Sequence, residues 1–197
     1  METRDIIIET AFLAFIEHGY DRVSLNSIVK KTGLTKGAFY HNFSSKSELI
    51  HEVMRKYFFE HINRTINLID VTGIRFEEKL AKIYANVMNV EVKLYAYPDK
   101  TISQEAFMHL FQECMDIDDE LKDMATNQQL ITIKAMEKAI DEAKDQGEIK
   151  NNMESRNLAE LINVTVRGTM MVASYLPKVE TEKMLKKNME TLLSLVK

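Results

Sequence analysis

With 197 residues, the chain is long enough to bury a sizeable hydrophobic core, as one domain or as two small ones. Hydrophobic residues make up 45% and charged residues 28%, a balance that excludes an intrinsically disordered chain. Six glycines and two prolines favour long helices over a many-stranded sheet, and the formal net charge is −4.

The sequence also indicates in which cellular compartment the protein is expected. A single cysteine, Cys114, cannot form an internal disulfide, which suits a reducing cytoplasm. No apolar run approaches the length that spans a bilayer. The N-terminal METRDIII carries acidic residues and lacks the basic region and long apolar core of a signal peptide. We therefore expect a cytoplasmic protein.

The first predicted helix covers residues 3–18. Its apolar stripe at helical spacing includes Ile7, Phe12 and Phe15, and Gly19 follows where a C-terminal cap is expected. Tyr20, just beyond, is interpreted as a half-buried residue that packs the N-terminal helices together.

The stretch from Ser24 to Lys46 predicts a short helix, a tight turn and a second short helix. Ser24 can cap the first helix, Gly33 supplies a turn in which positive φ costs least for glycine, and Thr35 can cap the second, over residues 36–42. The side chains expected to face inward on the second helix are Ala38, Phe39 and Phe43. Those expected to stay outside are Thr35, Lys36, Tyr40 and His41. This is the layout of a helix-turn-helix motif.

Charge supports that interpretation. From Arg22 to Ser47 there are five basic residues and no acidic one, in a chain that is acidic overall; the five are Arg22, Lys30, Lys31, Lys36 and Lys46. Such a window presents one face to an anionic partner. The alternative is a solvated helical hairpin with a chance cluster of charges.

The segment GLTKGAFYHNFSSKSELI resembles the TetR family of transcriptional regulators over roughly residues 6–50. The matching features are the amphipathic first helix, the Gly33 turn, Thr35-Lys36-Gly37, an aromatic residue at Tyr40, Phe43, and Lys46-x-Glu48-Leu49. Asn42 departs from the pattern, since the family often has a second histidine or a similar residue there. The resemblance implies an all-α fold of about nine helices. Residues 1–47 would form a three-helix helix-turn-helix DNA-binding head, and residues 48–197 a larger helical domain for effector binding and dimerisation.

The resemblance also implies which residues of the head contact DNA, and their chemistry agrees. Hydroxyl groups, basic side chains, a phenol and a ring N–H can grip phosphates, and base reading is expected near residues 35–38. Gly37 has no side chain, so the backbone there can approach DNA closely. The predicted DNA-binding residues are Ser24, Thr35, Lys36, Gly37, Ala38, Tyr40, His41 and Lys46.

Beyond the head, the chain predicts a series of long helices. Ser45 and Glu48 form an expected capping box that opens a helix continuing towards Asp70, in which Glu48 reaches back to the Ser45 N–H. Later helices are expected over residues 74–96, 103–115, 118–146 and 154–176. Thr181 is expected to cap the last helix, which runs to residue 197.

The last two predicted helices carry apolar stripes that fit a partner surface, and TetR-like proteins dimerise through their last two helices. The alternative is a purely intrachain core. The predicted interface residues are Leu158, Leu161, Ile162, Thr165, Gly168, Thr169, Val172, Leu185, Met189, Leu192, Leu193 and Val196.

Between the head and these helices the chain is rich in methionine and aromatic residues. Methionine packs adaptably, which suits a pocket for varied shapes, and TetR-like proteins bind small effectors in this region. Ordinary core packing is the alternative, and Arg167 can meet either an anionic ligand or a carboxylate of the chain. The predicted pocket residues are Tyr84, Met88, Phe107, Met108, Phe111, Met136, Arg167, Met170 and Met171.

The sequence offers no support for an enzyme. Its five histidines are scattered, and it contains no HExxH, CxxC, phosphate-binding glycine loop or nucleophile elbow, so neither a metal nor a cofactor is expected. The predicted function is a homodimeric DNA-binding regulator on a near-palindromic operator, a repressor released by a small-molecule effector. The alternative is a helical regulator that acts through protein partners without such an effector.

Overall fold

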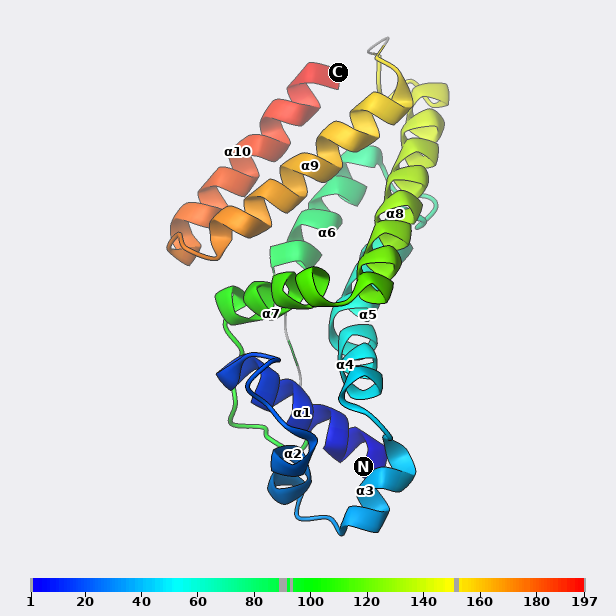
Figure 1. Cartoon of the computed structure of the whole chain (residues 1–197). Coiled ribbons are helices and arrows are strands. Elements are labelled where there is room, and N and C mark those ends of the chain that lie inside the picture. Colours follow the sequence, from blue (N-terminus) through cyan, green and yellow to red (C-terminus); the bar gives the residue numbers. More distant parts are fainter. Residues whose placement is uncertain (1, 89–91, 93, 151–152, 197) are drawn as a thin grey trace. The chain divides into compact units, whose positions relative to one another are not determined.

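The computed structural model describes residues 2–88, 92, 94–150 and 153–196, and every regular element in these residues is helical. The elements are α1 (Thr3–His18), α2 (Leu25–Thr32), α3 (Lys36–Asn42), α4 (Lys46–Met54), η1 (Arg55–Phe59), α5 (Glu60–Ile69), α6 (Phe76–Met88), α7 (Gln104–Ile117), α8 (Asp119–Asp145), α9 (Ser155–Ala173) and α10 (Lys178–Val196). The segments α4, η1 and α5 follow one another as one helix with a π-helical turn, which gives nine helices in these described ranges (Figure 1). The predicted all-α fold is confirmed.

The chain divides into two compact units. The first unit contains residues 1–60 and 91–124, and the second contains residues 61–90 and 125–197. The domain boundary predicted between residues 47 and 48 stays a prediction. Within the described residues, no helix combines the length and apolar character that a membrane span requires.

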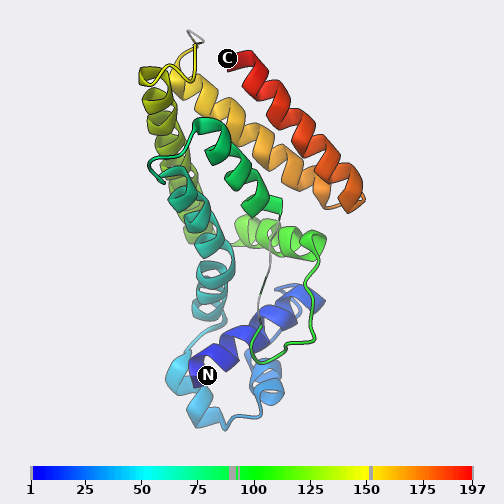
Figure 2. The same ribbon diagram turned by 180° about the vertical axis from the view of Figure 1, so that it is seen from behind.

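The first unit is built on α1, against which α2 and α4 pack (Figure 2). Burial of α1 explains this, because every residue from Ile7 to Phe15 is buried, and Ile7, Phe12 and Phe15 are almost completely so. Phe39 and Phe43 of the α3 region are also fully buried, so α3 presents its other side to solvent. Phe39 and Phe43 face inward as the sequence pattern predicts, whereas Ala38, also expected to face inward, is partly exposed.

Local hydrogen bonds hold the α2–α3 turn. The Ser24 hydroxyl accepts from the Ser27 N–H, and the Ser27 hydroxyl accepts from the Ser24 N–H, both at 3.2 Å. Gly33 ends α2 with φ of 69°, a left-handed conformation that favours glycine. The Thr35 hydroxyl then accepts from the Ala38 N–H at 3.2 Å. The helix-turn-helix geometry is therefore set by three caps that lie close together in the sequence.

The start of α4 differs from expectation in one detail. Ser45 caps the helix as predicted, accepting from the Glu48 N–H at 3.0 Å. The Glu48 carboxylate, however, accepts from both the N–H and the hydroxyl of Ser44, each at 2.8 Å. Ser44 offers two donors to one carboxylate oxygen, which explains why it takes this role.

The second unit has one hydrophobic core, to which α5, α6, α8, α9 and α10 contribute. Helix α6 contacts α9 and α10, and α9 and α10 lie side by side in both views (Figures 1 and 2). Ile140 in α8 and Leu158 and Ile162 in α9 are among its most buried residues.

Two predicted helix boundaries in this region were wrong. The helix predicted over residues 74–96 begins at Phe76, and residues 94–96 are not helical. The Ala96 N–H instead donates to the Glu9 carboxylate at 2.7 Å, a tertiary bond that a helix would have used internally. Helix α10 starts at Lys178, so Thr181 lies inside its first turns and donates to the Pro177 carbonyl rather than capping the helix.

Candidate functional site

The predicted DNA-binding residues of α3 gather on its solvent side. Lys36, Gly37 and His41 are exposed, Tyr40 is 44% exposed, and Ala38 is partly exposed. Thr35 is exposed at the start of the helix. We call the solvent-accessible residues of α3 and its N-cap the α3 face; its members are Thr35, Lys36, Gly37, Ala38, Tyr40 and His41.

The surface at Gly37 is open. A Cβ atom added there would meet no atom within 4 Å, and Gly37 has ordinary helical φ. No packing or backbone requirement of the free chain therefore explains a glycine inside a helix, where it costs roughly 0.5–1 kcal/mol relative to alanine. Close approach of another molecule to the backbone would explain it.

Ser24 and Thr35 use only part of their hydrogen-bonding capacity as caps. Each hydroxyl oxygen accepts one backbone N–H of its own helix. The hydroxyl proton remains to be donated, and both residues are exposed. Both hydroxyls can therefore cap a helix and bind an anionic group at the same time.

The Lys46 side chain packs over an aromatic ring and is partly buried. Its Nζ atom lies 4.0 Å from the centre of the Tyr20 ring. Burial lowers the pKa of Lys46, while Asp21 and Glu113 act in the opposite direction. Tyr20 in turn contacts Phe15, with ring centres 5.4 Å apart, which agrees with the packing role expected for it.

The basic residues of the acid-free window differ in their ion pairing. Arg22, Lys30 and Lys36 are exposed and form no ion pair within the part of the chain that the structure describes. Lys31 differs, because it lies 3.8 Å from the Glu17 carboxylate. Arg22 and Lys30 were not among the predicted contacts, although the acid-free window had pointed to them.

Arg4 fixes the C-terminal end of α3, which the sequence had not indicated. Its Nη1 donates to the Asn42 carbonyl at 3.2 Å, and its Nη2 lies 2.9 Å from the Glu52 carboxylate. The guanidinium also lies over the Phe43 ring, 4.4 Å from its centre. Asn42, the departure from the family pattern, donates to the Ala38 carbonyl at 2.9 Å. The end of α3 is therefore firmly held.

Within the first unit, helix α7 and the residues on either side of it contact α1, the α1–α2 loop and α4. Both carboxylate oxygens of Glu113 accept from the Tyr20 N–H at 3.0 Å. His51 Nε2 lies 2.9 Å from the Asp118 carboxylate. The fully buried Glu9 accepts from the Ala96 N–H. Polar contacts thus join α1, the α1–α2 loop and α4 to residues far along the chain.

The predicted effector residues fall into two groups. In the first unit, Phe107 and Phe111 stack on Phe58, with ring centres 3.9 and 5.6 Å apart, and Met108 is partly exposed. In the second unit, Tyr84 and Met136 are buried in the core, and Met170 packs against it. Met171 is 68% exposed, and the side chain of Met88 lies outside the described residues. As a pocket, the set stays a prediction.

Arg167, for which two partners had been considered, is exposed in the second unit. Its Nε donates to the Asn163 side-chain oxygen at 3.3 Å. Among the described residues it forms no ion pair with a carboxylate, so the interaction in the free chain is with an amide.

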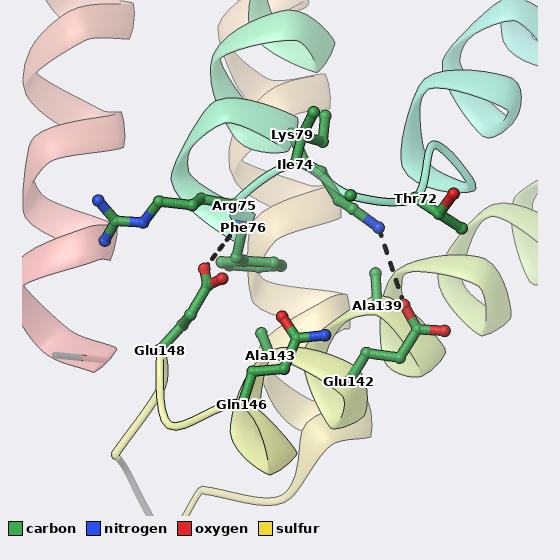
Figure 3. A pocket seen from close by; sticks show the side chains of 11 residues that line it. Thr72, Ile74, Arg75, Phe76, Lys79, Ala139, Glu142, Ala143, Gln146 and Glu148 are labelled. Atoms are coloured by element: carbon green, nitrogen blue, oxygen red, sulfur yellow. Dashed lines mark hydrogen bonds and ion pairs between the residues drawn. The ribbon is translucent and has the colours of Figure 1, made fainter.

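The second unit also contains a pocket of about 410 Å³ beside the first turn of α6 (Figure 3). The buried Lys79 ammonium donates to the Ile69 carbonyl at 3.0 Å and lies 3.8 Å from the Glu142 carboxylate. The Phe76 N–H donates to Glu148 at 2.7 Å. These contacts hold the start of α6 against the end of α8, and the predicted effector residues do not line this pocket.

Many predicted interface residues are already buried within the single chain. Leu158, Ile162, Thr169, Leu185, Leu192 and Leu193 are all 6% exposed or less. Thr165, Val172 and Met189 are partly exposed, Leu161 and Gly168 are exposed, and the side chain of Val196 lies outside the described residues. The interface as a whole stays a prediction, but the buried members stabilise the chain's own core.

A second apolar stripe lies on the exposed side of α9. Leu161, Val164 and Met171 are 40%, 67% and 68% exposed, and Tyr175, just after the helix, is 69% exposed. Together with Gly168 they follow the spacing of three and four residues that places side chains on one helix face. We call this set the α9 stripe: Leu161, Val164, Gly168, Met171 and Tyr175.

The chain is similar in sequence to known bacterial regulatory proteins. Residues 7–53 match the family model described as "Bacterial regulatory proteins, tetR family". A 90-residue segment is 31% identical to the HTH-type transcriptional regulator YuxN of Bacillus subtilis (strain 168), covering 44% of this chain and 31% of YuxN. The HTH-type transcriptional repressor ComR of Escherichia coli (strain K12) is 22% identical over 173 residues, covering 86% of this chain and 79% of ComR.

The match to the first curated relatives is confined to part of their length. The chain spans 31% of YuxN and 24% of the next relatives. Solved structures, by contrast, match over nearly the whole length of both chains. A TetR-family transcriptional regulator from Cytophaga hutchinsonii has a TM-score of 0.74 at 19% identity, covering 99% of this chain and 94% of that one. A SmeT–triclosan complex has a TM-score of 0.67 at 21% identity, covering 100% and 93%. At these identities the likeness shows the fold.

Proposed function

The head of this chain belongs to the tetR family of bacterial regulatory proteins, and from this premise we propose that the chain is a sequence-specific DNA-binding transcriptional repressor, released from its operator by a small-molecule effector. The α3 face carries this proposal. It is an exposed surface with hydroxyls, a basic side chain and an open glycine, on the second helix of a helix-turn-helix. Such a helix fits the major groove, where base edges present distinct donors and acceptors.

The charges around the α3 face suit the DNA backbone. Arg22, Lys30 and Lys36 are exposed, and the hydroxyls of Ser24 and Thr35 can donate to phosphate oxygens. Contacts of this kind orient a protein on duplex DNA, while base contacts supply specificity. We assign base reading to residues 35–38 and phosphate binding to Ser24, Tyr40, His41 and Lys46.

We propose a homodimer on a near-palindromic operator. One short recognition helix reads too few base pairs for a unique site, and a two-fold dimer doubles the number. The α9 stripe supports this assembly, because a two-fold axis beside it would bring the same apolar residues of two copies together. Gly168 lies within the stripe with open space around it, which allows close approach of two helices.

We propose that the effector acts on the second unit and that the helix formed by α4, η1 and α5 transmits the change. That helix begins at the head with Lys46 and continues to Ile69. A ligand can shift DNA affinity only through its different affinities for two conformations. SmeT, which shares this fold, has been solved in complex with triclosan, and that likeness supports a small-molecule effector for the present chain.

In this proposal the protein acts by binding DNA and an effector, without catalysis and without a cofactor, and it works in the cytoplasm. The second candidate, a regulator that acts through protein partners without an effector, makes a different prediction. It would bind operator DNA, yet no small molecule would change that affinity or raise the melting temperature.

Lys46→Ala tests the phosphate contacts. If Lys46 neutralises one phosphate, its removal weakens binding to all duplex sequences and reduces the slope of log affinity against log salt by about one. The slope is measured by fluorescence anisotropy between low and moderate salt. Lys82→Ala is the matched control, since Lys82 is an exposed lysine of the second unit paired with Glu78. An unchanged slope for Lys46→Ala would limit Lys46 to its contact with Tyr20.

A further inference from the structure

Helix α3, which carries the α3 face, has few packing contacts with other helices. Among the described residues, the extensive contacts between helices of the first unit join α1 to α2, α4 and α7, and α3 takes part in none of them. The helix has only seven residues, and isolated helices of that length are unstable in water. The orientation of α3 therefore depends on a small number of individual contacts.

Two buried aromatic side chains anchor α3 to the first unit. Phe39 lies within the helix, Phe43 directly follows it, and both are fully buried. Residues four positions apart lie on the same side of a helix. The two anchors therefore hold α3 along one line and leave it free to rotate about that line. Fixing the rotation requires a contact with a different part of the helix.

Arg4 of α1 makes such a contact. Its Nη1 donates to the carbonyl oxygen of Asn42, the last residue of α3, at 3.2 Å. Its Nη2 lies 2.9 Å from the Glu52 carboxylate in α4, and the guanidinium lies over the Phe43 ring at 4.4 Å from the centre. A cation at this end of a helix is also favoured by the helix dipole. One planar group thus joins the end of α3 to both α1 and α4.

The two groups that hold the guanidinium are themselves fixed. Glu52 also pairs with Arg55, three residues further along the chain. Arg4 belongs to α1, in which every residue from Ile7 to Phe15 is buried. A lysine could not reproduce these contacts, because its ammonium is a compact charge that cannot stack flat on a ring and donate in two fixed directions. The arrangement therefore requires arginine rather than a positive charge alone.

We infer that Arg4 is a positioning residue for sequence recognition: it fixes the rotation of α3 and thereby the fit of residues 35–38 to the operator bases. The inference rests on the proposed function, because it names a residue on which the specificity of that binding depends. Arg4 acts through α3 and does not itself contact DNA. Base contacts require exact geometry, whereas phosphate contacts are available on any sequence.

Arg4→Lys tests the inference because it keeps the positive charge. Fluorescence anisotropy measures the affinity for a duplex that the unmodified chain selects from random DNA, and for an unrelated duplex of equal length. Affinity for the selected duplex should fall about tenfold or more, the effect of losing one good base contact. Affinity for the unrelated duplex and the salt dependence should not change. An unchanged ratio of the two affinities would overturn the inference, even if the melting temperature falls.

Glu52→Gln separates positioning from a direct contact between Arg4 and DNA. The substitution removes a negative charge and releases Arg4 from its ion pair, so a direct contact would leave DNA affinity equal or higher. If Arg4 positions α3 through Glu52, affinity for the selected duplex should instead fall about threefold or more, as base contacts are weakened. Equal or higher affinity in Glu52→Gln would overturn the inference.

Hydrogen exchange, followed by NMR, tests the role of Arg4 in the free chain. The Phe43 N–H donates to the Phe39 carbonyl at 3.1 Å, so its exchange reports on opening of the last turn of α3. Arg4→Lys should speed exchange of the amides of residues 41–43 about threefold or more and leave those of α2 unchanged. Equal exchange rates at residues 41–43 would overturn the inference.

The matched controls are Arg156→Lys and Glu137→Gln. These two residues form an ion pair of 3.5 Å in the second unit, and the Arg156 side chain is 34% exposed, compared with 40% for Arg4. Neither control should change the ratio of the two affinities or the exchange of α3. If the unmodified chain prefers no duplex sequence, the proposed function falls and this inference with it. If the preference exists and is the same in Arg4→Lys and Glu52→Gln, only this inference falls.

Discussion

Replacing Val164 and Met171 together by glutamate is expected to convert the dimer into folded monomers and to lower operator affinity by about 100-fold or more. Both side chains are about two-thirds exposed in the single chain, so the substitutions leave its own core intact. In the proposed dimer they would bury four carboxylates without partners, which costs several kcal/mol. Loss of the second head also removes the gain in affinity that comes from binding two half-sites at once.

Light scattering measures the assembly, circular dichroism the helicity, and fluorescence anisotropy the DNA affinity. The matched control replaces Leu130 and Ile131 of α8 by glutamate, because these are also half-exposed apolar residues of the second unit. That control should remain dimeric. If the Val164/Met171 variant stays dimeric with unchanged DNA affinity, the interface does not involve the α9 stripe.

Gly37→Leu is expected to abolish specific DNA binding, with a loss of about 100-fold or more, while the fold becomes slightly more stable. A side chain at this position meets no atom of the free chain, and leucine favours a helix by roughly 0.5–1 kcal/mol over glycine. On DNA, the same side chain would occupy the space that base edges or phosphates need. A clash of this kind acts only in the complex.

The control for this experiment is Glu105→Leu, which places leucine at the second residue of another helix, α7, where the side chain is also exposed. Thermal unfolding and light scattering should show both variants folded and dimeric, and only Gly37→Leu should fail to bind the operator. Normal operator affinity in Gly37→Leu would mean that the N-terminal end of α3 does not enter the groove.

The sequence predicted the head well because its structure depends on local signals. Ser24, Gly33, Thr35 and Ser45 act within a few residues of their own positions, and the structure confirms all four as caps or turn residues. The all-α fold was likewise confirmed, and residues 7–53 match the tetR family model as the resemblance implied. Contacts between distant residues were not predictable, and Arg4, which holds Asn42 and Phe43, is the clearest example.

Periodicity also could not decide which face of α9 turns outward. Leu158 and Ile162 follow one apolar stripe, and Leu161 and Val164 follow another, so a helical pattern alone fits either orientation. The core of the second unit buries the first stripe and leaves the second exposed. In the same way, a methionine-rich composition suggested a pocket, whereas the structure divides the predicted pocket residues between the two units and leaves Met171 68% exposed.

Selection of bound sequences from random duplex DNA by the purified full chain tests the central claim most directly. A dimer with one α3 face in each half-site predicts enrichment of a near-palindrome, its two halves separated centre to centre by about 10 base pairs or a multiple of that spacing. Affinity for the selected sequence should fall steeply as salt rises. Failure to enrich any sequence at low salt, or enrichment of a single half-site without two-fold symmetry, would contradict the account.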